Sequence, residues 1–151
     1  MANDQATSPG KPAPRRALRA LTKAHVFLHK LSGGRLFNSM GGDEVCFVTM
    51  TGARTGNPVT IPLLYLPYEE GVLLVASQTG RPTNPIWYNN LVKHPEIEVR
   101  HRSDTQKLRA REAGADEKPG LWPLLDEMYP DFVLYRARTD RDIPIFVCEP
   151  A

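Results

Sequence analysis

The stretch Glu44–Leu66 reads EVCFVTMTGARTGNPVTIPLLYL, which is two apolar runs separated by a loop rich in glycine and threonine. The runs Glu44–Met50 and Val59–Leu66 have the length and the β-branched content of strands. The loop between them, Thr51–Pro58, holds two glycines and a proline, which are turn formers. The stretch therefore predicts two consecutive strands. Pro62 predicts an edge position or a bulge for the second strand, because proline cannot donate a ladder hydrogen bond.

Further short elements follow along the chain. Strands are expected at Gly71–Ser77, Pro95–Ser103, Lys107–Glu112 and Ile143–Cys148, and helices at 85–92 and Asp116–Met128. The second of these strands alternates apolar and charged residues and has the next as its hairpin partner, which is typical of an antiparallel sheet with one face in water. Short strands with few long crossovers favour an α+β, mainly antiparallel β fold, either a barrel or a sandwich with flanking helices. With six or so strands, a small closed barrel is the better interpretation.

The amino-terminal part of the chain differs in composition from the rest. Residues 1–14 are rich in proline, glycine and small polar residues, which predicts a flexible tail before a single domain at 15–151. Residues 15–31 place leucines on one side and cations on the other, which predicts an amphipathic helix. Residues 1–42 hold seven Lys and Arg against one acid, whereas the whole chain carries +2. Such a helix either packs its leucines on the domain or lies at an anionic membrane surface.

The composition of the chain excludes several classes of protein. Its 151 residues are 41% hydrophobic and 24% charged, as in one globular domain. No apolar run approaches the ~18–20 residues of a membrane span, and no signal peptide is visible, so a cytoplasmic location is expected. Basic residues do not interleave with aromatic ones, which argues against a nucleic-acid partner. Cys46 and Cys148 are expected as buried thiols, and His25 and His29 lack a third ligand for a metal.

Three stretches have a composition that suits binding. The loop 51–56 combines two glycines, two threonines and an arginine, as needed to hold an anion through N–H groups and a guanidinium, although a polar turn would look the same. Residues 76–90 lead from a glycine-bearing loop into a helix start with Trp87 and Tyr88, which offer flat surfaces for a ring or for the core. The aromatic residues of Tyr129–Tyr135 are three apart and share a helix face, a pattern that is more often core.

These stretches belong to a longer series of motifs. They are Thr49–Gly56, Pro62–Leu66, Ala76-Ser77 with Gly80, Asn84–Leu91, Met128–Pro130, and Tyr135 followed by Thr139–Pro144. In order and spacing the series resembles the deazaflavin-dependent nitroreductase family of actinobacteria, which are split-barrel oxidoreductases that use coenzyme F420. The resemblance extends over nearly the whole chain, from about residue 17 to residue 150.

The resemblance implies a six-stranded split β-barrel with flanking helices and coenzyme F420, an 8-hydroxy-5-deazaflavin, as the cofactor. The residues implied to contact F420 are Ala53, Arg54, Thr55, Val59, Thr60, Ile61, Pro62, Leu63, Leu64, Val75, Ala76, Ser77, Gln78, Ile86, Trp87, Tyr88, Asn89, Asn90 and Phe132. Catalytic roles are implied for Ser77, Tyr129 and Tyr135, which would lie near the acceptor over the exposed face of the ring.

The chain departs from the family's pattern at a few positions. The first loop commonly reads Gly-Arg-Lys-Ser/Thr-Gly, whereas Gly52–Gly56 has a single arginine, which can still grip a phosphate with two nitrogens. Gln78 and Thr79 stand where Lys and Gly are common, which leaves Arg81 to compensate near the coenzyme's polyglutamate tail. Phe132 stands where relatives that reduce nitroimidazole prodrugs carry a tyrosine, so the sequence argues against that activity.

The resulting hypothesis is an F420H2-dependent oxidoreductase that transfers a hydride to a small, flat, electron-poor acceptor such as a quinone, an enone or a nitroaromatic. An FMN-dependent reductase of the same fold is disfavoured because the usual flavin phosphate signature is missing. A protein that binds a deazaflavin or a lipid without turnover is the alternative from another class. The sequence makes no prediction of the oligomeric state.

Overall fold

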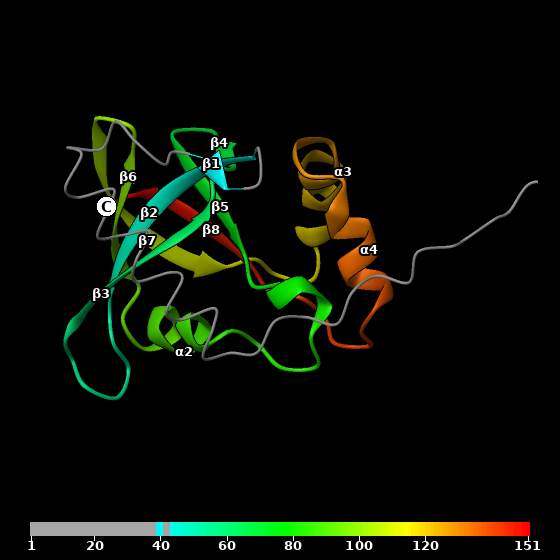
Figure 1. Cartoon of the computed structure of the whole chain (residues 1–151), viewed down its shortest axis with the longest axis horizontal. Helices are drawn as coiled ribbons and strands as arrows, with labels where there is room; N and C mark the ends of the chain where they lie inside the picture. The colour runs from blue at the N-terminus through cyan, green and yellow to red at the C-terminus, as the bar shows by residue number, and fades with distance from the viewer. Residues whose placement is uncertain (1–38, 41–42) are drawn as a thin grey trace, which may run out of the picture.

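The computed structural model describes residues 39–40 and 43–151, which Figure 1 draws as coloured ribbon. The flexible tail predicted at residues 1–14 and the amphipathic helix predicted at residues 15–31 lie outside the described residues.

The described chain is an α+β structure with mainly antiparallel β, as the sequence predicts. Its strands are β1 (Ser39–Met40), β2 (Asp43–Thr51), β3 (Pro58–Leu64), β4 (Pro67–Tyr68), β5 (Gly71–Val75), β6 (Glu96–His101), β7 (Asp104–Glu112) and β8 (Ile145–Pro150). Its helices are the short 3-10 segment η1 (Gln78–Gly80) and the α-helices α2 (Ile86–Lys93), α3 (Lys118–Met128) and α4 (Asp131–Ala137). All the strand pairings are antiparallel.

The sheet is open, so the expectation of a closed barrel is wrong. Its strands follow the order β1-β2-β6-β7-β8-β5-β4, with β3 paired to β2. The six predicted strands correspond to β2, β3, β5, β6, β7 and β8, and the two-residue strands β1 and β4 are additional. No ladder among the described residues joins β3 to β4. Pro58 and Pro62 of β3 and Pro67 of β4 have no N–H group, so they cannot donate to a further strand.

The β2–β3 pair has the regular register that the deciding stretch predicts. The ladder runs without interruption from Thr51 opposite Pro58 to Val45 opposite Leu64. Pro62 lies opposite Phe47 within this ladder, so β3 contains no bulge. Of the two predicted alternatives for Pro62, the edge position is therefore correct.

Strands β5 and β8 are buried on both faces, which explains why their sequences read as continuous apolar runs. One face contributes to a first core cluster that includes Val72, Leu74, Phe146 and Cys148 and is covered by Leu91 of α2. The other face contributes Leu73, Ile145 and Val147 to a second core cluster, with Leu121, Leu125 and Phe132 from α3 and α4. Figure 1 shows α2 and the α3–α4 pair on different sides of the sheet.

Several element ends differ from the predicted ones by a few residues. Pro85 precedes α2 as its capping residue, whereas the sequence predicted it at the first helical position. Helix α3 begins at Lys118, later than predicted, and the last strand is shifted to Ile145–Pro150. Backbone hydrogen bonding decides where a helix or strand ends, and the hydropathy pattern of the sequence does not indicate these hydrogen bonds. The predicted hairpin of β6 and β7 is confirmed.

Both cysteines are buried free thiols, as predicted. Burial raises the pKa of Cys46 and of Cys148 to about 12. The thiolate is the nucleophilic form of cysteine, so neither residue is a nucleophile at neutral pH.

Candidate functional site

The loop between β2 and β3 closes on itself through backbone hydrogen bonds. The Gly52 N–H donates to the Asn57 carbonyl at 2.8 Å, and the Gly56 N–H donates to the Gly52 carbonyl at 2.9 Å. Gly56 has a φ of +71°, a left-handed conformation that suits glycine. Arg54 lies exposed in this loop, and the described residues provide it with no ion-pair partner. The loop thus presents a guanidinium to solvent on a tightly folded backbone.

Helix α2 holds this loop by two side chains that meet at one residue. The Asn90 Oδ1 atom accepts a hydrogen bond from the Ala53 N–H at 2.8 Å, and Lys93 Nζ donates to the Ala53 carbonyl at 2.9 Å. The Asn90 amide nitrogen lies 3.5 Å from Met50 Sδ, so both ends of this buried amide contact the protein. Asn90, predicted as a cofactor contact, therefore supports the loop. Lys93 was missed by sequence reasoning, and its only signal was a basic residue in the last helical turn.

The side chains of β3 point alternately to two faces, which divides the six cofactor contacts predicted there. Val59, Ile61 and Leu63 are half-buried and pack against the first core cluster. Thr60, Pro62 and Leu64 alternate with them, and Thr60 Oγ1 lies 2.8 Å from Thr49 Oγ1 in a hydrogen bond across the ladder. A flat ligand on one face of β3 can therefore touch the side chains of only one of the two sets.

Helix α2 adds two half-buried aromatic rings to the same cluster. The ring centroids of Trp87 and Tyr88 lie 5.9 Å and 5.6 Å from that of Phe146. Trp87 thus packs on the core and still keeps part of its ring accessible. Burial raises the pKa of Tyr88, whose hydroxyl donates to Glu112 Oε2 at 3.0 Å. The two other predicted contacts of the helix, Ile86 and Asn89, are exposed.

The chain after β5 makes a turn in the left-handed region of the backbone. Its φ angles are 46° at Gln78, 55° at Thr79 and 79° at Gly80, a combination that is unfavourable for the first two residues. The Gln78 amide donates to the Thr83 carbonyl at 2.9 Å, so this side chain folds back over its own loop. Ser77, which precedes the turn, is 8% exposed, and its hydroxyl makes no capping hydrogen bond.

The predicted aromatic stripe is helical in part and borders the end of β5. The Tyr129 and Tyr135 hydroxyls lie 2.9 Å apart, and both rings pack half-buried against the second core cluster together with Val75. Phe132 is only 1% exposed, and its ring centroid lies 4.9 Å from that of Tyr129, so it is a core residue between them. Burial raises the pKa of Tyr129. Ala76 is fully buried.

Two arginines that sequence reasoning left without a role join the turn to the segment that follows α4. Arg138 Nη1 donates to the Thr79 carbonyl at 3.2 Å, and its guanidinium lies 5.6 Å from the centre of the Tyr135 ring. Arg141 donates to carbonyl groups of the same loop. Arg141 lies within the motif Thr139–Pro144 and Arg138 directly precedes it, but the motif marks the segment and does not indicate its contacts.

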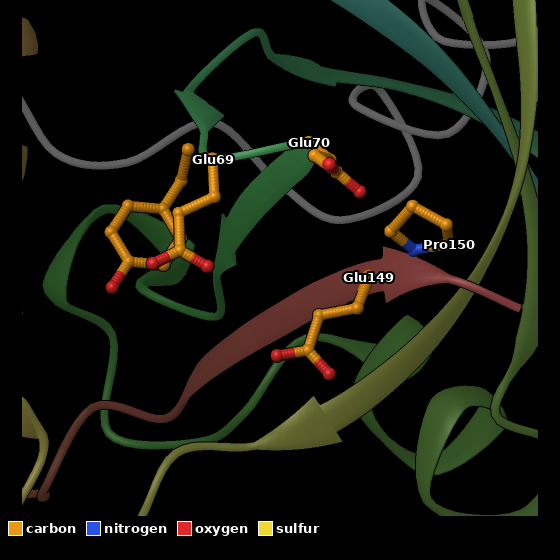
Figure 2. A pocket seen from close by; sticks show the side chains of 6 residues that line it. Glu69, Glu70, Glu149 and Pro150 are labelled. Atoms are coloured by element: carbon orange, nitrogen blue, oxygen red, sulfur yellow. The ribbon is translucent and has the colours of Figure 1, made fainter.

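A hollow of about 400 Å³ lies elsewhere, at the β4–β5 turn. It is lined by Tyr68, Glu69, Glu70, Gly71, Glu149 and Pro150, and Figure 2 shows the three carboxylates around it. In Figure 1, β4 lies at the end of the sheet away from α2, so this hollow is separate from the predicted site. An acidic lining also disfavours a phosphate ligand.

No three His, Cys, Asp or Glu side chains among residues 39–40 and 43–151 come together as a metal site requires. No helix in those ranges is long and apolar enough to cross a bilayer. His25 and His29 lie outside the described residues.

Comparison with known proteins places the chain among redox enzymes. Residues 21–150 match the family model described as F420H(2)-dependent quinone reductase. A protein of Mycobacterium tuberculosis (strain ATCC 25618 / H37Rv), provisionally named as such a reductase, is 36% identical over 97 residues, which cover 64% of this chain and 82% of the relative. A second F420H(2)-dependent quinone reductase of that strain is 28% identical over 138 residues, covering 84% and 88% of the two chains.

Solved structures agree with this assignment. The structure of an F420-H2 dependent reductase (FDR-A) is similar with a TM-score of 0.64 and 34% identity, over 70% of this chain and 93% of that one. A structure described as a domain-swapped dimer has a TM-score of 0.66 and 30% identity, over 91% of this chain and all of the other. Because the family model spans most of the chain and the loop, turn and aromatic motifs fall within it, the chain belongs to the F420H(2)-dependent quinone reductase family.

Proposed function

We propose that this chain reduces a quinone, or another flat and electron-poor acceptor, with reduced F420 as the electron donor. The observation that carries the proposal is the pairing of Ala53 with Asn90. That bond fixes an exposed guanidinium loop beside a half-buried apolar surface built from β3 and α2. A ligand that has both an anionic group and a flat ring needs a cation beside an apolar surface.

The residues present fit F420. Its phosphate and carboxylates need cations and free N–H groups, and Arg54 stands exposed on a loop that two glycines allow to fold tightly. Its ring needs an apolar wall that is only half-covered by protein, and Ile61, Leu63 and Trp87 have this character. Gln78 adds no charge and is bonded to Thr83, so Arg54 is the main anchor that we assign to the anionic tail.

Bound reduced F420 supplies a hydride, which is two electrons transferred together. The chain's own task is to hold the acceptor against the donor ring and to stabilise negative charge on the acceptor oxygen. The Ser77 hydroxyl has no capping bond and suits this role. The Tyr129–Tyr135 pair uses one O–H within itself, so the second O–H is available to the acceptor. Burial raises the pKa of Tyr129 and keeps this phenol protonated.

The test is turnover with defined donors and a defined acceptor. Purified full-length protein is mixed with F420H2 and menadione, and formation of oxidised F420 is followed by its absorbance. Oxidation at catalytic rates that requires both compounds supports the proposal. FMNH2 or NADPH in place of F420H2 should give no turnover above the rate without protein.

Two results would contradict the proposal in different ways. Tight binding of F420 without oxidation by any quinone would make the chain a binding protein. Turnover with FMNH2 and none with F420H2 would make it a flavin enzyme. A parallel fluorescence titration with F420 separates the two, because only the first outcome retains F420 binding.

A further inference from the structure

The guanidinium of Arg141 donates hydrogen bonds to several acceptors of one loop. Its Nη2 donates to the Ser77 carbonyl at 2.8 Å and its Nη1 to the Ala76 carbonyl at 3.0 Å. Its Nε and Nη2 donate to the Arg81 carbonyl at 3.2 Å and 3.1 Å, and Nη1 also donates to the Asn84 side-chain oxygen. One planar guanidinium therefore connects both ends of the segment 76–84.

These acceptors are neutral, which is unusual for a half-buried cation. Within residues 39–40 and 43–151, no carboxylate lies within ion-pair distance of Arg141. The adjacent carboxylate, Asp142, pairs instead with Lys118 at 2.8 Å. Burial accordingly lowers the pKa of Arg141 from its usual range. The backbone carbonyls of the loop therefore replace water around the guanidinium. The loop needs the guanidinium to hold its conformation, and the guanidinium needs these carbonyls to stay charged while half-buried.

The segment that Arg141 holds contains the left-handed turn. Gln78 and Thr79 have φ angles of 46° and 55°, which such residues keep only when their surroundings enforce them. Replacing Gly80 by any other residue would destabilise the turn, because a Cβ there would lie 2.6 Å from the Tyr135 carbonyl oxygen. Arg138, the residue that caps the carboxyl end of α4, donates to the Thr79 carbonyl at 3.2 Å. Arg138 and Arg141 thus hold the turn from two sides, because Arg141 donates a hydrogen bond to Ser77, the residue that precedes the turn.

We propose that Arg141 is a positioning residue of the hydride-transfer site, which holds the 76–81 segment so that the Ser77 hydroxyl faces the acceptor. The inference rests on the proposed function for its catalytic consequence. The Ser77 carbonyl accepts from both Arg141 Nη2 and the Gly80 N–H, which fixes the backbone of Ser77 and leaves its hydroxyl outside this network. A lysine cannot replace the arginine, since one ammonium group cannot reach acceptors at both ends of the loop.

The first experiment measures the loop without using activity. Hydrogen exchange is followed by mass spectrometry in wild type, Arg141→Lys and the matched control Arg111→Lys. Arg111 also makes several side-chain bonds, to Glu117 and Glu149, and none of them touches the loop. Faster exchange in peptides covering residues 76–84 of Arg141→Lys alone supports the proposal. Unchanged exchange in these peptides contradicts it.

The second experiment asks whether Arg141 acts through Ser77. With F420H2 and menadione, Arg141→Lys should lower kcat roughly 10- to 100-fold, as expected when a reacting group is displaced by about 1 Å. In a Ser77→Ala background the same change should cost less than about threefold, because effects that act through one group are not additive. Losses that multiply in the double variant, or a wild-type kcat in Arg141→Lys, contradict the proposal.

A milder variant covers the case in which Arg141→Lys does not fold. Asn84→Ala removes one acceptor of the guanidinium and leaves the charge in place. It should raise exchange in the 76–84 peptides and lower kcat by a smaller factor than Arg141→Lys. A wild type without F420H2 turnover would refute the proposed function, while the exchange experiment would still decide whether Arg141 holds the loop.

Discussion

The side-chain oxygen of Asn90 lies 2.8 Å from the backbone nitrogen of Ala53, so a residue in the middle of α2 fixes a loop 37 positions earlier in the chain. Both residues were expected to touch the cofactor. The hydrogen bond shows that Asn90 holds the loop that carries Arg54. Asn90 is 7% exposed, so its amide has little water to bond in place of Ala53.

Replacing Asn90 by alanine should destabilise the fold by about 1–3 kcal/mol, because it removes the acceptor of the half-buried Ala53 N–H. Urea unfolding measures this. The exposed neighbour Asn89 provides the control, and Asn89→Ala should stay within about 0.5 kcal/mol of wild type. Equal stabilities for the two variants would remove the supporting role of Asn90.

Replacing Arg54 by alanine should weaken F420 binding by roughly 1.5–3 kcal/mol, the contribution of a charge-assisted contact. Fluorescence titration gives the Kd, and the thermal midpoint should hardly change because Arg54 is exposed. Arg102→Ala is the matched control, since Arg102 is also exposed and pairs with Glu44 away from the loop. An unchanged Kd at low salt in Arg54→Ala would place the anion elsewhere.

The stability of the protein should fall as pH rises through and above about 10, in part because of Tyr129. Burial raises the pKa of this phenol above its ordinary value of 10.0. The unfolded chain then releases its proton at a lower pH than the folded chain, so the contribution is complete below pH 10 and is lost at higher pH. Unfolding at several alkaline pH values should show a shallower decline for Tyr129→Phe. Identical slopes would contradict the assignment.

Replacing Thr79 by glycine should stabilise the protein by about 0.5–1 kcal/mol, since it relieves a left-handed φ of 55° against the entropy cost of glycine. The loss of the bond from Thr79 Oγ1 to the Gln78 carbonyl limits the gain. Thr105→Gly in β7 should instead lower the thermal midpoint, as glycine does inside a strand. A lower midpoint for Thr79→Gly would show that the turn is not strained.

Phe132→Tyr tests the expected preference among acceptors. Phe132 is 1% exposed, so an added hydroxyl without a partner should cost about 1–3 kcal/mol of stability. Wild type should reduce menadione well and bicyclic nitroimidazoles poorly, and Phe132→Tyr should raise the ratio of nitroimidazole to menadione turnover. Efficient nitroimidazole reduction by wild type would show that Phe132 is no barrier.

The sequence by itself determined most of the elements, the antiparallel class and the family. Alternation and turn residues are local properties, so Glu44–Met50 and the helix after Pro85 could be identified within a few positions. The motif series from Thr49 to Pro144 identified the family in the same way, because it depends on residue types and their spacing.

Only the tertiary structure decided what those residues do. Whether the sheet closes depends on ladders between strands far apart in the chain, and among the described residues no ladder joins β3 to β4. Asn90 and Phe132 support other residues because of what the fold packs around them. The roles of Lys93 and Arg141 arise from bonds to residues 40 or more positions away. A local pattern does not encode such contacts, since they form only when the burial of two core clusters brings distant segments together.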